Sequence, residues 1–157
     1  MNFLKIFIIL FLMPLFLSNC AKEEKTSLIV EEDVELQMIR AFKEGYDEFR
    51  EGDALFAAKK FNEAELLFPQ SSWAPKAALM AAYVYYSQDY YFDAESELKR
   101  FIKTYPNNPD LNYAHFLLAM CYYEKIVDEK KDTGPLLQAQ EKFNFIVKEY
   151  PNSDYAL

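Results

Sequence analysis

A short pattern, an aromatic residue followed by proline and polar residues, occurs three times in this chain. Its copies are FPQSSWA at residues 68–74, YPNNPDL at 105–111 and YPNSDYA at 150–156. Proline lacks a backbone N–H and therefore ends a helix, and the polar residues that follow it can cap the next helix. The pattern predicts a chain of helices that stop and restart at regular intervals.

Small residues recur at fixed distances from these prolines. Gly45, Ala82 and Ala119 lie 37 residues apart, and Ala57, Ala94 and Ala139 each stand twelve residues before a proline. The second interval between prolines is 45 residues instead of 37, because a polar segment at 128–135 is inserted there. The order of small, apolar and proline positions resembles the tetratricopeptide (TPR) pattern, with a unit about three residues longer than the usual ~34.

The predicted helices span residues 34–51, 54–67, 73–87, 90–104, 110–127 and 136–149, and a seventh begins near Ser153. They form hairpin units at about 34–70, 71–107 and 108–152 within a domain of residues 34–157. A single hairpin exposes an apolar face, so the units must stack. The fold class is therefore all-α, a TPR-like superhelix of antiparallel helix hairpins with three repeats and the start of a fourth.

The same segments suggest particular helix caps. Asp53 is expected to cap the second helix, and Ser72, in preference to Ser71, the third. Asn108 is expected to cap the fifth helix, with Pro109 as its first residue.

The first nineteen residues differ from the rest of the chain. Lys5 precedes an apolar run at residues 6–17 that is short and contains Pro14. This arrangement is typical of a secretory signal peptide, here residues 1–19.

The junction Leu17-Ser18-Asn19-Cys20 resembles the lipobox of bacterial lipoproteins, although Asn19 stands where Gly, Ala or Ser is usual. The resemblance implies lipid attachment at Cys20, followed by a polar tether over residues 20–33. Ala21 is not the aspartate that commonly retains lipoproteins in the inner membrane, which implies the outer membrane. The alternative is an ordinary signal peptide with a cysteine near its end. The polar residues directly after Cys20 favour the lipobox.

Composition excludes several classes of protein. Hydrophobic residues at 52% and aromatic residues at 17% exclude a disordered chain, and three glycines speak against glycine-rich phosphate loops. A net charge of −8 without a Lys/Arg cluster makes nucleic acid an unsuitable partner. The single histidine, His115, and Cys121 lie in apolar helical runs without metal-ligand spacing. We therefore expect no catalysis, cofactor or bound metal.

Six residues are candidates for a binding groove, because in the TPR family the concave surface carries the positions one and four residues after the small residue. These positions hold Tyr46, Phe49, Tyr83, Tyr86, Met120 and Tyr123. Aromatic anchors suit the recognition of apolar or aromatic peptide ends. An aromatic stripe at helical spacing also suits a core, so each residue alone fits either role, and the set as a whole favours the groove.

The sequence around the prolines is more specific than a helical repeat requires. The matching segments are 69–74, 81–86, 101–106, 113–114 and 150–156. They resemble the BamD family of lipoproteins in the outer-membrane β-barrel assembly machinery, over about residues 38–157. The resemblance implies a lipid-anchored periplasmic scaffold. Its implied partners are BamA, the other machinery subunits and the C-terminal segments of unfolded outer-membrane proteins, which typically end in an aromatic residue.

Members of that family continue for two more repeats, which carry the main BamA contact. Either this chain is a fragment, or the BamA contact is lost or moved; an uncapped last hairpin would expose apolar surface, which favours a fragment. Two alternatives remain. One is an unrelated TPR lipoprotein that acts as an adaptor for cell-wall or cell-division enzymes. The other is the regulatory domain of an enzyme.

Overall fold

Six α-helices and no strand make up residues 33–127 and 132–157, which are the residues that the computed structural model describes. The helices are α2 (Val34–Glu51), α3 (Ala54–Leu67), α4 (Ala74–Ser87), α5 (Tyr91–Thr104), α6 (Leu111–Glu124) and α7 (Gly134–Glu149). The predicted all-α fold is confirmed. The proposed signal peptide, Cys20 and the tether up to residue 32 lie outside the described residues.

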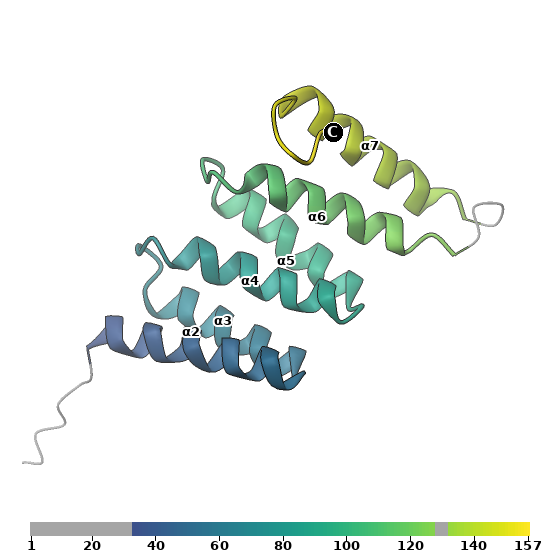
Figure 1. Ribbon diagram of the computed structural model, residues 1–157. Coiled ribbons are helices and arrows are strands. Elements are labelled where there is room, and N and C mark those ends of the chain that lie inside the picture. The colour runs from purple at the N-terminus through teal and green to yellow at the C-terminus, as the bar shows by residue number, and fades with distance from the viewer. Residues whose placement is uncertain (1–32, 128–131) are drawn as a thin grey trace, which may run out of the picture. The chain divides into compact units, whose positions relative to one another are not determined.

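The helices pair as three antiparallel hairpins, and each helix packs against the next one along the chain. The first helices of the hairpins, α2, α4 and α6, lie on one side of the stack, and α3 and α5 lie on the other (Figure 1). Helices α4 and α6 also contact each other directly. One surface is therefore built by the first helix of every repeat.

Small residues allow this packing. A Cβ atom added to Gly45 would lie 3.1 Å from the carbonyl oxygen of Ala57 and 3.1 Å from the Phe61 ring, so a larger residue there would require its neighbours on α3 to shift. Ala82 and Ala119, the equivalent residues of the next two repeats, are completely buried. The small position of the repeat is thus the point where the two helices of a hairpin approach most closely.

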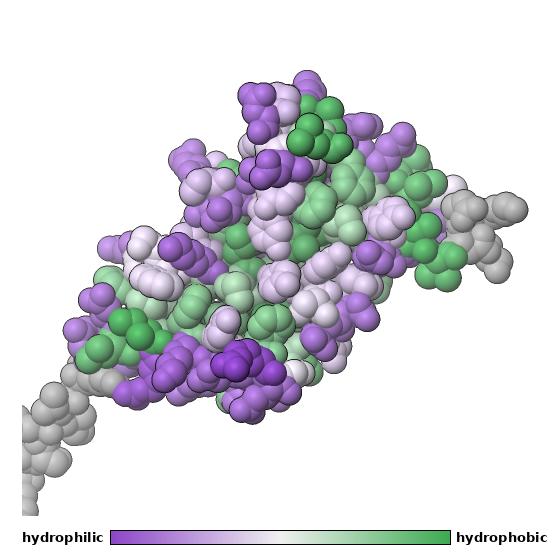
Figure 2. All heavy atoms as spheres, in the orientation of Figure 1, coloured by the Kyte–Doolittle hydropathy of each residue, from purple (hydrophilic) through white to green (hydrophobic). Residues whose placement is uncertain are grey.

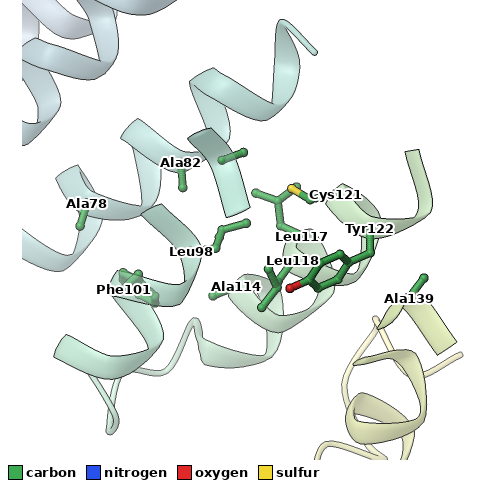
Figure 3. Packing of buried hydrophobic residues seen from close by; sticks show 11 residues of the cluster. Ala78, Ala82, Leu98, Phe101, Ala114, Leu117, Leu118, Cys121, Tyr122 and Ala139 are labelled. Carbon is green, nitrogen blue, oxygen red and sulfur yellow. The ribbon is translucent and has the colours of Figure 1, made fainter. Parts of the chain in front are cut away.

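Each repeat also buries the residue five positions before its proline. Ala64, Phe101 and Ile146, each five residues before a proline, are completely buried. The largest cluster joins the second and third hairpins, with side chains from α4, α5 and α6 surrounding Leu98 and Leu117 (Figure 3). The repeat pattern of the sequence is therefore the pattern of the core.

The turns that join one hairpin to the next have one geometry. The N–H of Ser71 donates to the carbonyl of Phe68, and the N–H of Ala74 donates to that of Ser71. The same two bonds form in the later copies, through Tyr105, Asn108 and Leu111 and through Tyr150, Ser153 and Ala156. The predicted helix near Ser153 is not formed, because this residue lies inside the turn. The fourth unit starts with that turn alone.

Two predicted helix starts need correction. Ser72 does not cap α4, because Trp73 is the residue directly before this helix and it makes no side-chain cap. Ser71 instead stabilises the turn before α4, since its Oγ accepts hydrogen bonds from the N–H groups of Trp73 (3.3 Å) and Ala74 (3.1 Å). The turn bond to Phe68 places Ser71 beside these amides, whereas Ser72 is exposed. Helix α6 begins at Leu111, so Pro109 lies before the helix.

The predicted cap at Asn108 is wrong, because Asp110 is the residue directly before α6 and it makes no side-chain cap. Asn108 stabilises the preceding turn instead, since its Oδ1 accepts a hydrogen bond from the N–H of Asp110 at 2.8 Å. The predicted cap at Asp53 is confirmed, since its Oδ1 accepts from the N–H of Phe56 at 2.9 Å. Gly52 ends α2 in the left-handed conformation, with φ 92°.

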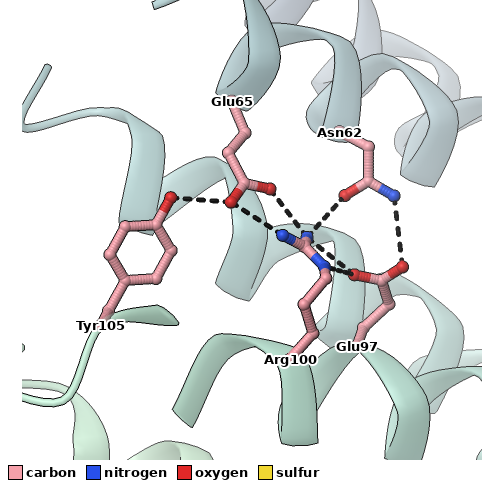
Figure 4. A network of polar contacts seen from close by, with 5 residues as sticks. All are labelled: Asn62, Glu65, Glu97, Arg100 and Tyr105. Atoms are coloured by element: carbon pink, nitrogen blue, oxygen red, sulfur yellow. Dashed lines mark hydrogen bonds and ion pairs between the residues drawn. The ribbon is translucent and has the colours of Figure 1, made fainter. Parts of the chain in front are cut away.

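A buried polar network connects the second helices of the first two hairpins (Figure 4). The Glu65 side chain accepts two hydrogen bonds from the Arg100 guanidinium, at 2.7 and 2.8 Å, and one from the Tyr105 hydroxyl at 2.7 Å. Asn62 and Glu97 complete the contacts of Arg100. The hydrogen bonds to Glu65 raise the pKa of Arg100, which therefore stays charged and holds α5 against α3.

Candidate peptide-binding groove

A pocket of about 470 Å³ opens on the face formed by α2, α4 and α6. Its lining residues are Phe42, Lys76, Leu79, Met80, Tyr83, Asp110 and Tyr113. Figure 2 shows hydrophobic side chains in green across the middle of this face and hydrophilic ones in purple along its edges. The central pocket is therefore mainly apolar, with one lysine and one aspartate at its margin.

Two further pockets adjoin the central pocket through shared residues. A pocket of about 260 Å³ shares Phe42 and is also lined by Met38, Ile39, Lys43 and Trp73. A polar pocket of about 450 Å³ shares Asp110 and Tyr113, and Asn112, Asn152 and Asp154 are among its other lining residues. We call these three pockets together the inner groove. It crosses all three hairpins and changes from apolar at α2 to polar beyond α6.

Aromatic contacts hold the apolar end of the inner groove in shape. The Phe42 ring meets the rings of Phe61 and Trp73 edge-on, with centroids 5.1 and 5.2 Å away. The Lys76 ammonium lies 4.9 Å from the centre of the Trp73 ring, a cation–π distance. Because Phe61 is completely buried, it gives Phe42 a rigid support. The wall between the two apolar pockets is thus anchored in the core.

The six predicted groove residues occupy different environments. Tyr83 lines the central pocket, and its ring contacts that of Phe49 at 5.9 Å. Tyr86 and Met120 are half-buried, and Tyr86 packs against the core cluster and the ring of Tyr91. Burial raises the pKa of the Tyr86 hydroxyl.

The remaining two, Tyr46 and Tyr123, are exposed to 49% and 55%. The structure therefore brings the rings of Tyr83 and Phe49 together, and of these two only Tyr83 lines the central pocket. Tyr83 and Tyr86 both pack against the core cluster, and Tyr86 does not line the pocket. A role in peptide binding stays a prediction for all six.

The sequence analysis missed the pocket residues that precede the small position. Phe42 and Leu79 stand three residues before Gly45 and Ala82, and Lys76 stands six residues before Ala82. Tyr113 has the same relation to Ala119. These residues therefore lie on the same helix face as the predicted residues, one and two helical turns closer to the N-terminus. Extending the same helical period would have identified them.

Charges are distributed unevenly along the inner groove. Lys43 and Lys76 line its apolar part and are exposed, and neither forms an ion pair within the described part of the chain. Asp110 and Asp154 line its polar part. The lysines of the inner groove thus lie toward its α2–α4 end and the aspartates toward its α6 end, and the two signs meet in the central pocket, which Lys76 and Asp110 both line.

The described residues offer little to metal or thiol chemistry. Within 33–127 and 132–157, no group of three His, Cys, Asp or Glu side chains could hold a metal ion. Cys121 is completely buried, and this burial raises the pKa of its thiol to about 12. Its thiol is therefore protonated and unreactive at neutral pH. None of the helices described in these ranges is both long and apolar enough to cross a membrane.

Comparison with known proteins gives the family of the chain. Three relatives named "Outer membrane protein assembly factor BamD" come from Caulobacter vibrioides, Rickettsia prowazekii and Neisseria gonorrhoeae. They are 34%, 31% and 26% identical to this chain, over 88%, 69% and 90% of its length and 45%, 46% and 57% of theirs. The chain thus spans about half the length of the curated relatives it matches.

The match to a family model covers the helical repeats completely. The model, described as "YfiO: Outer membrane lipoprotein", matches residues 34–157, from the first residue of α2 to the last turn. Because the model and the relatives agree over these residues, the chain belongs to the YfiO family of outer membrane lipoproteins.

Proposed function

We propose that this protein is a lipid-anchored, periplasmic scaffold of outer-membrane β-barrel assembly, whose inner groove binds the C-terminal segments of unfolded barrel proteins. One observation carries the proposal: an apolar, aromatic-walled pocket of about 470 Å³ lies on the shared face of the repeats in a chain of the YfiO family. The relatives are named as outer membrane protein assembly factors, which supports the same process.

The chemistry of the inner groove suits such a ligand. Strands of outer-membrane barrels alternate apolar and polar residues, and aromatic residues gather at the membrane interfaces. Successive apolar side chains on one face of an extended strand lie about 7 Å apart. Two apolar pockets that share Phe42 as a common wall can therefore take two such side chains at once. The rigid aromatic walls supply anchor contacts at low conformational cost.

The proposed anchor at Cys20 would keep the inner groove near the membrane. Residues 20–33 would separate the lipid from α2, and a fully extended chain of this length reaches roughly 45 Å. Several acyl chains on one cysteine give stable attachment where a single chain would be marginal.

We also assign BamA and other machinery subunits as partners, on the strength of the resemblance and the family. The alternative of an adaptor for cell-wall or cell-division enzymes is not favoured, because the family match covers every described helix. A pull-down with tagged, lipidated protein from solubilised outer membranes tests this point. Recovery of BamA is expected, and recovery of cell-wall hydrolases without BamA would contradict the assignment.

Peptide binding provides the direct test of the inner groove. A labelled peptide that ends in Phe is expected to bind more tightly than the same peptide ending in Ser. Tyr83→Ala, which opens the wall of the central pocket, is expected to weaken binding of the Phe peptide about tenfold. Phe92→Ala is a matched control, since Phe92 is an aromatic residue of α5 with 78% exposure. Equal losses in both variants would show that the inner groove is not the site.

A further inference from the structure

We propose that the inner groove binds an extended peptide in one direction, with its C-terminal carboxylate between Lys43 and Lys76 and its upstream residues toward Asp110 and Asp154. This inference rests on the proposed function and adds the orientation of the ligand and the charges it must carry. The ligand is a peptide with a free carboxylate, an apolar last residue and a basic residue upstream.

The first step is the continuity of the inner groove. The small apolar pocket and the central pocket share Phe42, and the central and polar pockets share Asp110 and Tyr113. A single extended segment can therefore occupy all three.

The second step is the direction. Lys43 and Lys76 flank the wall at Phe42, from the middle of α2 and the first turn of α4. Both side chains are exposed and unpaired within residues 33–127 and 132–157, so each can pair with a ligand without breaking an existing ion pair. A carboxylate is stabilised there and repelled at the opposite, acidic end. The C-terminus of the peptide therefore lies at the α2–α4 end.

The third step is the register. Side chains of an extended peptide alternate, so the last residue and the third residue from the end face the same side. The last residue occupies the small pocket of about 260 Å³, and the third from the end occupies the central pocket of about 470 Å³. Residues farther upstream then cross the polar pocket beside Asp110 and Asp154. A basic side chain upstream of these two positions can pair with these carboxylates.

The experiment measures peptide affinities by fluorescence anisotropy. The parent peptide carries an apolar last residue, a free carboxylate and an upstream lysine. One derivative is amidated at its C-terminus, and another carries glutamate in place of the lysine. For the wild-type protein, each change is expected to weaken binding about fivefold at low salt, and less at high salt because screening weakens exposed charge pairs.

Two groups of variants assign these effects to the two ends of the inner groove. Lys43→Met with Lys76→Met keeps the apolar side-chain stems and is expected to remove the amidation effect while the effect of upstream glutamate persists. Asp110→Asn with Asp154→Asn is expected to do the reverse. Lys103→Met with Lys148→Met is the charge-matched control, because both residues are exposed in the last turns of α5 and α7. It is expected to preserve both effects.

The outcomes separate this inference from the proposed function. If the parent peptide binds but amidation weakens the wild type and the Lys43/Lys76 variant equally, the orientation is wrong and the inner groove is still a peptide site. If amidation acts through Asp110 and Asp154 instead, the peptide lies in the opposite direction. If neither the parent nor its derivatives bind, the proposed function fails as well.

Discussion

The pairing of Glu65 with Arg100 shows how one residue can join two repeats. The Glu65 side chain is buried, with 5% residue exposure, and Arg100 supplies two of its three hydrogen bonds. Breaking a buried pair costs more than the pair itself contributes, because the remaining charge loses its partner. The network therefore matters for the register between the first two hairpins.

Arg100→Met is expected to lower the free energy of unfolding by about 2 kcal/mol, toward the lower end for buried pairs because Arg100 itself is partly exposed. Urea denaturation measures this change. Lys99→Met is the control, since its partner Glu95 is shared with Lys125 and the Lys99 side chain is 55% exposed. The control is expected to cost less than about 0.5 kcal/mol. Equal costs would show that Glu65 does not depend on Arg100.

His115 makes the third hairpin sensitive to pH. Its ring lies 4.6 Å from Phe145 and 5.9 Å from Tyr150, and its buried Nδ1 has no hydrogen-bond partner among the described residues. Burial, and then the charge of Lys142, lower the pKa of His115 below its usual 6.5. Histidine in the unfolded chain therefore binds a proton more readily than histidine in the fold. The stability that this difference provides is fully present above pH 6.5 and is lost as the pH falls through the lowered pKa.

The urea midpoint of the wild type is therefore expected to fall more steeply from pH 7 to pH 5 than that of His115→Phe. Phenylalanine retains the ring contacts and has no proton to bind. Carboxylates contribute equally to both proteins, so the difference between the two curves isolates His115. Parallel curves would rule out the histidine as the source of the pH dependence.

At the scale of the helices, Gly45 affects how α2 and α3 pack against each other. A Cβ atom at this position would lie unusually close to Ala57 and Phe61, so a larger side chain requires α3 residues to move. Gly45→Val is expected to lower the free energy of unfolding by about 2 kcal/mol, because α2 must move away from α3. Ser96→Val, on the exposed face of α5, is the control and is expected to change stability by less than about 0.5 kcal/mol. Thermal unfolding followed by circular dichroism measures both variants.

Helix positions could be predicted closely from the sequence, because proline and small residues act locally. The predicted bounds of α2 and α3 agree with the structure, and those of α4 and α5 differ by one residue at the start. Helix α6 ends at Glu124, three residues earlier than predicted. This end could not be predicted, because the apolar residues after Glu124 are compatible with a longer helix. Helix caps were harder to predict, because Ser71 and Ser72 are neighbouring serines, and which of them bonds to the backbone depends on a turn that forms only in the folded protein.

The candidate site was harder to predict than the helices, because it is a property of several repeats together. Tyr83 was found from its offset to Ala82, but the opposite wall at Phe42 comes from another hairpin. Tyr86 has an equally favourable offset and packs against the same core cluster as Tyr83, but it does not line the central pocket. One helical period cannot distinguish a side chain that meets the next repeat from one that faces open space. Only the stacking of three hairpins makes that distinction.

Because the inner groove includes residues of α2, α4 and α6, a ligand there should stabilise the three hairpins as one body. A ligand that binds only the folded state adds about 2.7 kcal/mol at a concentration one hundred times its Kd. For a helical domain of this size, the unfolding midpoint is then expected to rise by roughly 10 °C. Scanning calorimetry with the Phe-ending peptide measures this shift.

The number of thermal unfolding transitions tests whether the ligand contacts all three hairpins. Linked hairpins should unfold in one transition that moves as a whole, because Phe42 of α2, Tyr83 of α4 and Tyr113 of α6 together line the pocket proposed for the peptide. Tyr83→Ala at the same peptide concentration should show a much smaller shift, since it weakens binding. A transition that splits in two, with only one part moving, would confine the ligand to a single hairpin and contradict an inner groove shared by all three.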